Sequence, residues 1–424
     1  MGDALKTSYY NVVTSIENQE YIIFNTRTGR ALKLNQQRFD EYVFFQDNNR
    51  GDQDYIDVLT KLEFLVPENM DEIKHIKKRY HSKIDGGKKL TVTVGLTENC
   101  NFRCVYCYQA HEITNHDEKI SDAFIELLTS KEWLNFTSLH INWFGGEPLL
   151  KMDLIKKLNS YAIEFCKANK WDLTQSITTN GSLINDSKMN DLKSMGIRNF
   201  QITVDGESEQ HNATRPFHNG ISSYDKVIQG IGKVINSNCH CIIRINLNRP
   251  VGDKIEQLID DIIGQGANKN NSVIHVVRAL NHKDGSVDGF YYSNEEYSHV
   301  WVKCLKKIKA YGFHIPHVLP IPYNCSFDNG KTVFIDHNGL HGSCSSIPTN
   351  NDDSKIKISF IPLYEKNTLF GVKKREDSFF DSYCRKCKIL PSCVGGCQYL
   401  EKAGQEKCSP EKYVIEDLIR LNYS

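Results

Sequence analysis

Apolar and polar residues alternate at two different periods along this 424-residue chain. Within residues 1–35 the alternation has the period of a strand, in the runs YNVVTSI, EYIIFN and ALKLN. Short runs of this kind, separated by turn residues, predict a three-stranded antiparallel meander. Helical patterns follow over residues 36–46, 52–65 and 71–83, before a Gly-Gly break. We therefore expect a small N-terminal α/β domain followed by a linker.

From Lys89 onward, strand-like runs alternate with longer amphipathic stretches. The predicted strands cover residues 90–96, 139–144, 174–179, 200–205, 241–247 and 272–278. Each is followed by a segment with helical periodicity, and repeated β–α units predict a parallel sheet with helices outside. Right-handed crossovers curl such a sheet into a barrel or partial barrel, with functional groups at the carboxyl ends of its strands. The predicted fold class is α/β, with a partial (β/α)6 TIM-like barrel at its centre.

Composition narrows the class of function. Lys+Arg and Asp+Glu both number 52, so the charge balance suggests no nucleic-acid or membrane partner. The N-terminus lacks a signal-peptide pattern, and no apolar run is long enough to span a bilayer. We expect a cytoplasmic protein, in which fourteen cysteines are more suited to binding metal than to forming disulfides.

Three of these cysteines follow the first strand of the predicted barrel. Cys100, Cys104 and Cys107 have the spacing C-x3-C-x2-C. Three thiolates on one tight loop suit three corners of an iron–sulfur cubane and leave one iron open to a ligand. By spacing alone, a zinc site completed by His111 or His116 is the alternative.

Polar and glycine residues stand at the ends of the next strands, where a barrel builds its binding site. The second strand ends in Gly145-Gly146-Glu147-Pro148, the third in Thr179-Asn180-Gly181, and the fourth in Thr203-Val204-Asp205-Gly206. Arg244 lies in the fifth strand, where it would meet either a ligand carboxylate or a structural ion-pair partner. Such groups at consecutive strand ends are expected for a site that holds an amino-acid ligand.

The cysteine triad, the GGEP turn, the TNG and the VDG together resemble radical S-adenosylmethionine enzymes over about residues 89–315. The resemblance implies that the triad binds a [4Fe–4S] cluster whose open iron chelates S-adenosylmethionine. It also implies that Glu147 contacts the amino group of this ligand and that Tyr106 packs near its adenine. One electron then cleaves the ligand to methionine and a 5′-deoxyadenosyl radical, which abstracts a substrate hydrogen. The expected cofactor-binding residues are Tyr106, Gly145, Gly146, Glu147, Asn180, Thr203, Asp205 and Arg244.

The remaining patterned cysteines lie near the C-terminus. Cys325 is followed by thirteen residues, Gly339, four residues and Cys344, and then by Cys384-x2-Cys387-x5-Cys393-x3-Cys397 and Cys408. This order resembles the seven-cysteine SPASM pattern of peptide-modifying radical enzymes, which implies two auxiliary [4Fe–4S] clusters. The resemblance assigns Cys384, Cys387, Cys393 and Cys408 to one cluster, and Cys325, Cys344 and Cys397 to the other, which has either an open iron or an unrecognised ligand. A pair of zinc knuckles, or a module that only transfers electrons, is the alternative.

The N-terminal unit resembles the winged-helix-like RiPP recognition element that binds a leader peptide, by strand addition at a sheet edge; a structural cap is the alternative. The expected domains are residues 1–85 (recognition element), 86–315 (radical barrel) and 316–424 (SPASM domain). The expected partners are a ribosomally made precursor peptide and a reductant such as flavodoxin or ferredoxin. The expected reaction forms a thioether between a cysteine sulfur and a carbon.

Three other functions stay open at this point. Enzymes of the same architecture form carbon–carbon or carbon–oxygen cross-links between side chains. A formylglycine-type enzyme that acts on a folded protein would need no leader-binding domain. A non-catalytic iron–sulfur or zinc protein would bind a peptide without cleaving S-adenosylmethionine.

Overall fold

The structure, a computed structural model, describes residues 4–113, 115–281, 289–317, 325–342, 344–346, 381–402 and 404–423. The chain divides into two compact units, each assembled from segments that are distant in sequence. One contains Met1–Gly86, Pro316–Cys325 and Val372–Ser424, and the other contains Gly87–Ile315 and Ser326–Gly371. The division into three domains along the chain stays a prediction.

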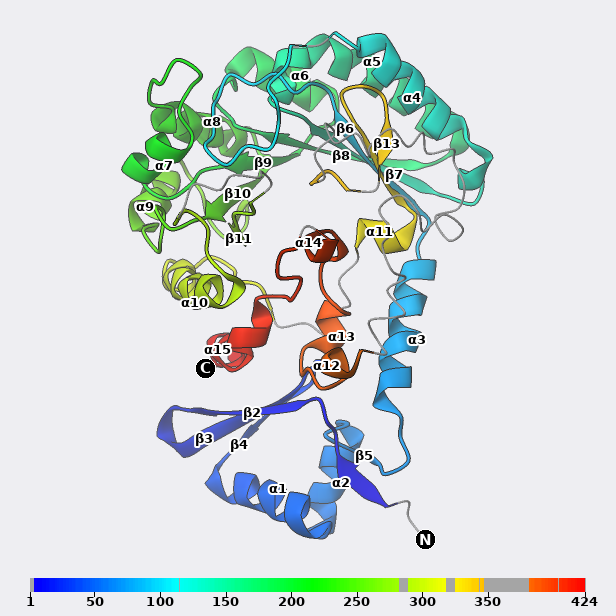
Figure 1. The fold of residues 1–424 in the computed structure, drawn as a ribbon, viewed down its shortest axis with the longest axis vertical. Coiled ribbons are helices and arrows are strands. Elements are labelled where there is room, and N and C mark those ends of the chain that lie inside the picture. Colours follow the sequence, from blue (N-terminus) through cyan, green and yellow to red (C-terminus); the bar gives the residue numbers. More distant parts are fainter. Residues whose placement is uncertain are drawn as a thin grey trace. The chain divides into compact units, whose positions relative to one another are not determined.

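A mostly parallel sheet is the centre of the second unit (Figure 1). Its six consecutive parallel strands are β6 (Lys89–Gly95), β7 (Ser138–Phe144), β8 (Asp172–Thr179), β9 (Asn199–Thr203), β10 (His240–Leu247) and β11 (Ser272–Arg278). Each pairs with its neighbours in sequence, as the pattern of strand-like runs predicts. The predicted α/β fold with a parallel sheet is confirmed, and the sheet is consistent with a partial TIM-like barrel.

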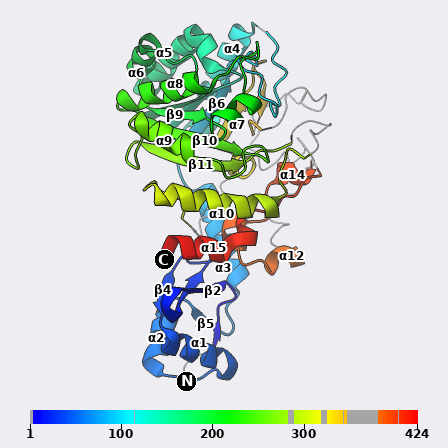
Figure 2. The ribbon, with the colours of Figure 1, turned by 90° about the vertical axis from the view of Figure 1, so that its left-hand side faces the viewer.

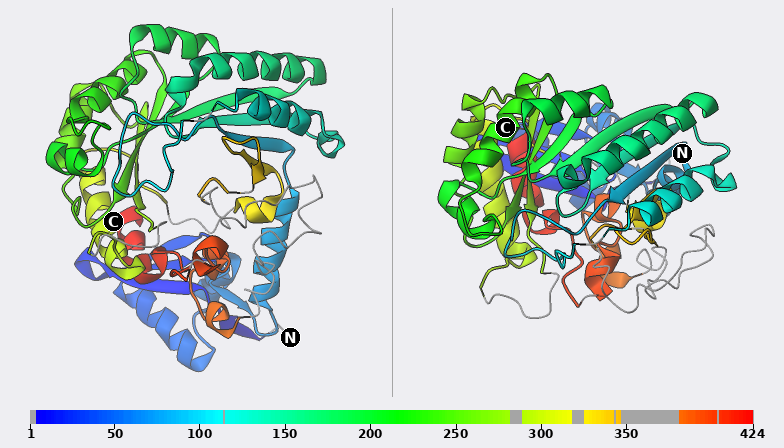
Figure 3. Two further views of the ribbon diagram at one scale, coloured as in Figure 1. Left: turned by 45° about the horizontal axis from the view of Figure 1, so that its top comes forward. Right: turned by 90° about the horizontal axis from the view of Figure 1, so that it is seen from above.

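Helices cover the outer face of this sheet (Figures 1 and 3). They are α4 (Asp117–Thr129), α5 (Met152–Asn169), α6 (Asp186–Ser194), α7 (Ser208–Thr214), α8 (Tyr224–Asn236), α9 (Glu256–Gly264) and α10 (Asn294–Ala310), with short 3₁₀ turns η2 (Lys131–Trp133) and η3 (Pro148–Lys151). A capping box of Ser293 and Glu296 begins α10. In the described part of the chain, no helix combines the length and apolar character needed to cross a membrane.

The two faces of the parallel strands differ in polarity. Alternate residues such as Val92, Ile141 and Ile243 are fully buried and belong to the apolar core. The residues between them, such as Thr93 and Asn142, are polar and only half-buried. Since successive side chains point to opposite faces of a sheet, one sequence pattern produces both the core and a polar inner wall.

Two strands of this sheet were not predicted. Strand β12 (Thr332–Ile335) pairs in parallel with β6, and β13 (His341–Gly342) pairs with β12 in the antiparallel sense. A short helix, α11 (Ser326–Asn329), precedes β12. Four residues of strand pattern in a region rich in turns are too few to identify a partner about 240 residues earlier in the sequence.

The first unit contains the expected meander, formed by β2 (Asn11–Ile16), β3 (Glu20–Asn25) and β4 (Ala31–Leu34), with η1 (Glu17–Gln19) in the first turn. Helices α1 (Gln36–Asn48), α2 (Gln53–Lys61) and α3 (Glu72–Asp85) follow. Each helix begins after an N-cap residue whose side-chain oxygen accepts a hydrogen bond from a backbone N–H of the first turn. These residues are Asn35, Asp52 and Asp71 respectively. Strand β1 (Leu5–Thr7) pairs with β5 (Leu65–Pro67), which the sequence did not indicate.

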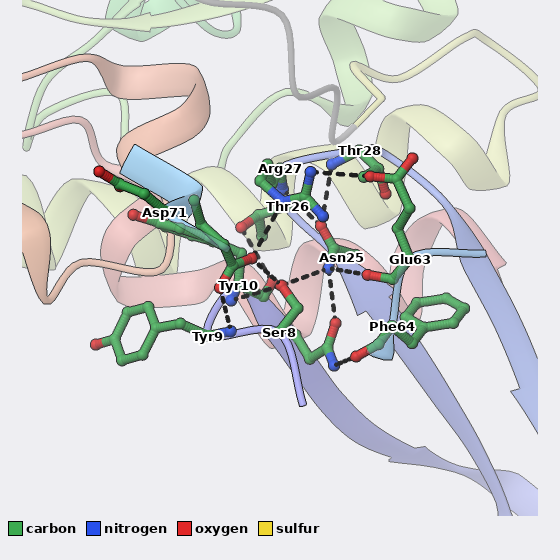
Figure 4. A network of polar contacts seen from close by, with 12 residues as sticks. Ser8, Tyr9, Tyr10, Asn25, Thr26, Arg27, Thr28, Glu63, Phe64 and Asp71 are labelled. Carbon is green, nitrogen blue, oxygen red and sulfur yellow. Dashed lines mark hydrogen bonds and ion pairs between the residues drawn. The ribbon is translucent and has the colours of Figure 1, made fainter. Parts of the chain in front are cut away.

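A buried polar network connects these elements (Figure 4). The Asn25 side chain donates to Ser8 Oγ at 2.9 Å and to Asn11 Oδ1 at 2.7 Å. The Arg27 guanidinium forms ion pairs with Glu63 at 2.9 Å and with Glu72 at 3.1 Å. Arg27 and Glu72 are both more than nine-tenths buried, so each charge depends on its partner for compensation.

The C-terminal segments of the first unit pack against its N-terminal segment. Helix α15 (Glu411–Tyr423) lies along β2 (Figure 2), where Ile419 joins a core cluster with Val12, Ile22 and Phe24. The short helices of the cysteine-rich tail are α12 (Ser382–Arg385), α13 (Leu390–Cys393) and α14 (Gln398–Lys402). Leu390 and Val394 pack with Tyr10, Ile76 and Tyr80, so the first and last segments of the chain share a core.

Two arginines that pair with the same glutamate test this network. Replacing Arg27 by Met leaves the buried Glu72 carboxylate without its cation and is expected to cost about 3–5 kcal/mol of stability. The matched control, Arg30→Met, removes a half-exposed partner of Glu63 and should cost less than about 1 kcal/mol. Urea unfolding of the full chain measures both, and equal losses for the two variants would contradict the assignment.

Candidate functional site

The cysteine loop leaves the end of β6 and is held by the segment that follows α7. Arg103 N donates to Pro216 O at 2.9 Å, and Val105 N donates to Thr214 O at 3.0 Å. The Phe102 ring meets Phe217 edge-on, with ring centroids 4.9 Å apart. These contacts fix the backbone that carries Cys100, Cys104 and Cys107.

The glycine turn after β7 lies directly against this loop. Gly146 N donates to Thr97 O at 2.7 Å, and Glu147 N donates to Asn99 O at 2.9 Å. A Cβ atom on Gly146 would lie 2.4 Å from Asn99 O, which no ordinary contact permits. Glycine at this position is therefore required for the close approach of the two loops.

Glu147 is completely buried and binds protein groups through both oxygens. Oε1 accepts from Leu149 N at 3.0 Å and from Thr179 Oγ1 at 2.7 Å, and Oε2 accepts from Asn180 N at 2.8 Å. Burial raises the pKa of this carboxyl, while the three hydrogen bonds lower it. The expected contact of Glu147 with an amino group stays a prediction, and in this structure the carboxylate joins the ends of β7 and β8.

A second buried network surrounds Tyr106. The phenol donates to Asp205 Oδ2 in a short hydrogen bond and accepts from Arg215 Nη1 at 2.5 Å and Asn246 Nδ2 at 3.0 Å. Asp205 Oδ1 in turn accepts from Asn246 N at 2.8 Å. One tyrosine hydroxyl thus joins the cysteine loop to Asp205, to the end of β10 and to the end of α7. Asn246 was not identified from the sequence, because an asparagine within a strand has no distinctive signature.

These elements enclose a cavity of about 560 Å³ on the inner face of the sheet. Its wall contains the predicted site residues Cys100, Cys104, Cys107, Tyr106, Gly145, Gly146, Asn180, Thr203 and Arg244. Two predicted residues, Glu147 and Asp205, lie behind this wall and support it. The rest of the wall is the polar face of the strands, including His140, Asn142, Ser176 and Thr178, which were not assigned to the site from the sequence.

The three loop cysteines line this one cavity. In the described part of the chain, no three histidine, cysteine or carboxylate side chains have the geometry to hold a single metal ion. Zinc needs four ligands at about 2.0–2.3 Å from one point, whereas a cubane cluster takes one thiolate at each of several separate corners. The placement of the thiols alone leaves the zinc site that the spacing indicated as the alternative.

Burial sets the protonation of these thiols. It raises the pKa of Cys100 to about 12 and that of Cys104 to about 11, with the Arg215 guanidinium opposing the shift at both. Buried thiols of this kind become thiolates when a cationic centre binds them. The donor set thus fits an iron–sulfur cluster.

Four tail cysteines lie near one another within the first unit. The pKa of Cys384 is raised to about 11, chiefly by burial, and Cys393 and Cys408 contribute to this rise. Burial likewise raises the pKa of Cys408, with contributions from Cys393 and Cys387. These are the four residues that the resemblance assigns to one auxiliary cluster.

The other predicted set of tail ligands is divided between the units. Cys325 and Cys397 belong to the first unit, and Cys344 belongs to the second. Cys344 raises the pKa of Tyr108 through its charge, and the Tyr108 hydroxyl donates to Ser345 O at 2.8 Å.

Comparison with known proteins identifies the cavity-bearing unit. Residues 94–262 match the family model described as the Radical SAM superfamily. The chain carries a radical SAM domain. Domains of this superfamily bind S-adenosylmethionine and a [4Fe–4S] cluster, which agrees with the three thiols in the cavity wall.

Two curated relatives match parts of this chain. An uncharacterised protein of Methanocaldococcus jannaschii is 25% identical over 65% of this chain and 93% of its own length. A GTP 3′,8-cyclase of Clostridium perfringens is 29% identical over 41% of this chain and 48% of its own length. The chain thus spans about half the length of such cyclases, so their activity does not transfer with the domain.

Solved structures extend the likeness of fold beyond the radical SAM domain. Native anSMEcpe with bound AdoMet aligns with a TM-score of 0.55 at 15% identity, over 79% of this chain and 97% of that one. Streptococcus suis SuiB bound to its precursor peptide SuiA aligns with a TM-score of 0.50 at 17% identity, over 96% and 98% of the two chains. At these identities the likeness is one of fold.

The glycine turn offers a test of the cysteine loop. Gly146→Ala forces the turn away from Asn99 O and should displace the cysteine loop. If all three clusters form in the unmodified chain, that chain retains roughly twelve iron atoms after anaerobic reconstitution, and the variant should retain roughly eight. Gly264→Ala is the control, because nothing lies within 4 Å of the added Cβ atom. Full iron retention by Gly146→Ala would show that the loop does not depend on the close approach.

Proposed function

We propose that this chain is a radical SAM peptide maturase that forms a thioether cross-link in a ribosomally made precursor peptide. The observation that carries the proposal is the cavity in which three cysteine thiols face the polar inner wall of a radical SAM domain. Cys100, Cys104 and Cys107 would hold the catalytic [4Fe–4S] cluster. The residues that would hold S-adenosylmethionine are Tyr106, Gly145, Gly146, Glu147, Asn180, Thr203, Asp205 and Arg244.

The bound cluster and S-adenosylmethionine, given one electron, supply methionine and a 5′-deoxyadenosyl radical. In the substrate, one C–H bond and one S–H bond break and one C–S bond forms. The hydrogen atom leaves with the deoxyadenosyl group, and the thiol loses its proton to solvent. One electron remains, for which an auxiliary cluster held by the tail cysteines would be the acceptor. Flavodoxin or ferredoxin is the class of reductant that would supply the first electron.

The tail cysteines supply a place for that acceptor. Cys384, Cys387, Cys393 and Cys408 would hold one auxiliary cluster, a proposal supported by their mutual electrostatic influence. Cys325, Cys344 and Cys397 would hold the other cluster, with a position open to the cysteine sulfur of the substrate. A thiolate bound there would be directed to the carbon radical without a protein base.

Peptide binding is proposed from a groove in the first unit. Its volume is about 410 Å³, and it lies between the edge strand β2 and helix α1, with Val13 and Ser15 on one side and Phe39 and Val43 on the other. Ser15 O accepts from Arg420 Nε at 3.1 Å and so points away from β3. Backbone groups alternate in direction along an antiparallel strand, so the backbone N–H and C=O of Val13 point to the same open edge of β2 as those of Ser15.

Edge strands beside an apolar helix bind extended peptides by strand addition. Thr14 of β2 also lines the groove, and its buried Oγ1 has no hydrogen-bond partner in the described part of the chain. The SuiB structure, which shares this fold, contains a precursor peptide. We therefore assign the groove to the leader segment of the substrate, in keeping with a RiPP recognition element.

Two neighbouring residues on α1 test the groove. Val43→Glu puts a charge in its apolar wall and should weaken binding of the precursor about tenfold or more in fluorescence anisotropy. Phe44→Glu makes the same kind of change on an exposed residue outside the groove and should leave binding unchanged. Equal affinities in the two variants would assign the leader to another surface.

The product is tested by mass spectrometry of the precursor encoded beside the gene. A thioether lowers the mass by two hydrogens per bridge and protects the bridged cysteine from alkylation. The same mass loss in a precursor whose cysteines are all replaced by Ala would establish carbon–carbon or carbon–oxygen cross-linking instead. A cysteine converted to an aldehyde would indicate formylglycine-type chemistry.

A further inference from the structure

Arg215 is a buried cation at the edge of the cysteine loop, and no step of the proposed reaction uses it. It follows α7, where its N donates to His211 O at 2.7 Å and its O accepts from Ser223 Oγ at 2.6 Å. Only 7% of the residue is exposed. The backbone bonds therefore fix the point from which the guanidinium extends toward the loop.

The guanidinium contacts the loop at two places. Nη1 donates to the Tyr106 hydroxyl at 2.5 Å, and the central carbon lies 5.8 Å from the centroid of the Phe102 ring. The nearest counter-charge that the structure records is Asp205 Oδ2, at 3.9 Å from Nη1. Arg215 thus lies closer to the hydroxyl of Tyr106, which directly precedes the third cysteine of the loop, than to the carboxylate of Asp205.

One donor of this guanidinium lacks a partner. Arg215 Nε is buried and makes no hydrogen bond within the described part of the chain. A buried donor on a charged group that is left unsatisfied costs more free energy than a neutral one. Arg215 also lines the cavity that Cys100, Cys104 and Cys107 share. An electron-rich acceptor bound in this cavity would satisfy the Arg215 Nε donor.

We infer that Arg215 donates through Nε to a sulfur of the cluster held by the three loop cysteines, and raises its reduction potential. The inference rests on the proposed cluster, but not on the identity of the peptide or the product. Hydrogen bonds to cluster sulfurs and nearby positive charge stabilise the reduced state, which carries one more negative charge. In a buried site such a charge is weakly screened, so its effect is larger than at a surface.

Asp205 has the opposite role in this arrangement. Its buried carboxylate partly neutralises Arg215 and would oppose addition of an electron to the cluster. Arg215 is therefore a positioning and tuning residue, since it acts on the cluster and not on the substrate. If Arg215 and Asp205 served only to hold the cysteine loop in place, the result would differ. Loss of either side chain would then loosen the loop without shifting the reduction potential of the cluster in opposite directions.

The test is an anaerobic redox titration of the full, reconstituted chain, monitored by electron paramagnetic resonance without peptide. The spectrum of the Cys100→Ala, Cys104→Ala, Cys107→Ala triple variant is subtracted to remove any tail clusters. Arg215→Gln should lower the ratio of reduced to oxidised loop cluster at least tenfold at a fixed potential, equivalent to about 59 mV for one electron. Asp205→Asn should raise that ratio.

Two further variants control for charge and for folding. Arg249→Gln makes the same change of charge at a half-exposed arginine paired with Glu296, and should leave the potential unchanged. Arg215→Lys keeps the charge but lacks the Nε donor, so its shift should have the same sign as that of Arg215→Gln and be smaller. It decides the question if Arg215→Gln fails to hold iron.

The possible outcomes separate the inference from the proposed function. An unchanged potential in Arg215→Lys would overturn the inference and leave the cluster assignment intact, whether Arg215→Gln also keeps its potential or fails to hold iron. Shifts of the same sign in Arg215→Gln and Asp205→Asn would also overturn it. If the unmodified chain held no cluster that depends on the three loop cysteines, the proposed function itself would fail.

Discussion

Alternation of side chains across the parallel strands is the constraint on which the site depends. The same strands that bury Ile141 and Ile243 under the outer helices turn Asn142 and Arg244 inward. A shift of one residue in register would exchange the two sets, exposing the core and filling the cavity with apolar side chains. The cavity is therefore specified by the core that surrounds it, which is why it can remain polar within a stable domain.

The loops at the strand ends convert this cavity into a site for a cluster. Their geometry depends on contacts between backbone segments, above all the approach of Gly146 to Asn99 and the bonds from the cysteine loop to residues 214–216. The buried carboxylates Glu147 and Asp205 connect neighbouring loops from behind the wall. Charged groups thus contribute to the shape of the site as well as to its chemistry.

Much of this arrangement could be predicted from the sequence, because it follows from local patterns. The six parallel strands have a clear alternation, and the spacing of Cys100, Cys104 and Cys107 is distinctive. Contacts between distant segments could not be predicted. Strand β12 is short, the hydroxyl of Tyr106 meets Asn246 across 140 residues, and the packing of α15 on β2 joins the two ends of the chain. That last contact also means that deleting the N-terminal domain would expose apolar residues of α15, so point variants in the groove are the cleaner test of its role.

The central claim is that the loop cysteines hold a cluster that binds and cleaves S-adenosylmethionine. The most direct measurement is formation of 5′-deoxyadenosine by the reduced, anaerobically reconstituted chain, compared with the triple variant Cys100→Ala, Cys104→Ala, Cys107→Ala. The account predicts 5′-deoxyadenosine from the unmodified chain and none from the variant, which keeps the iron of its tail. Absence of 5′-deoxyadenosine from an unmodified chain that holds its full iron, or equal amounts from both proteins, would contradict it.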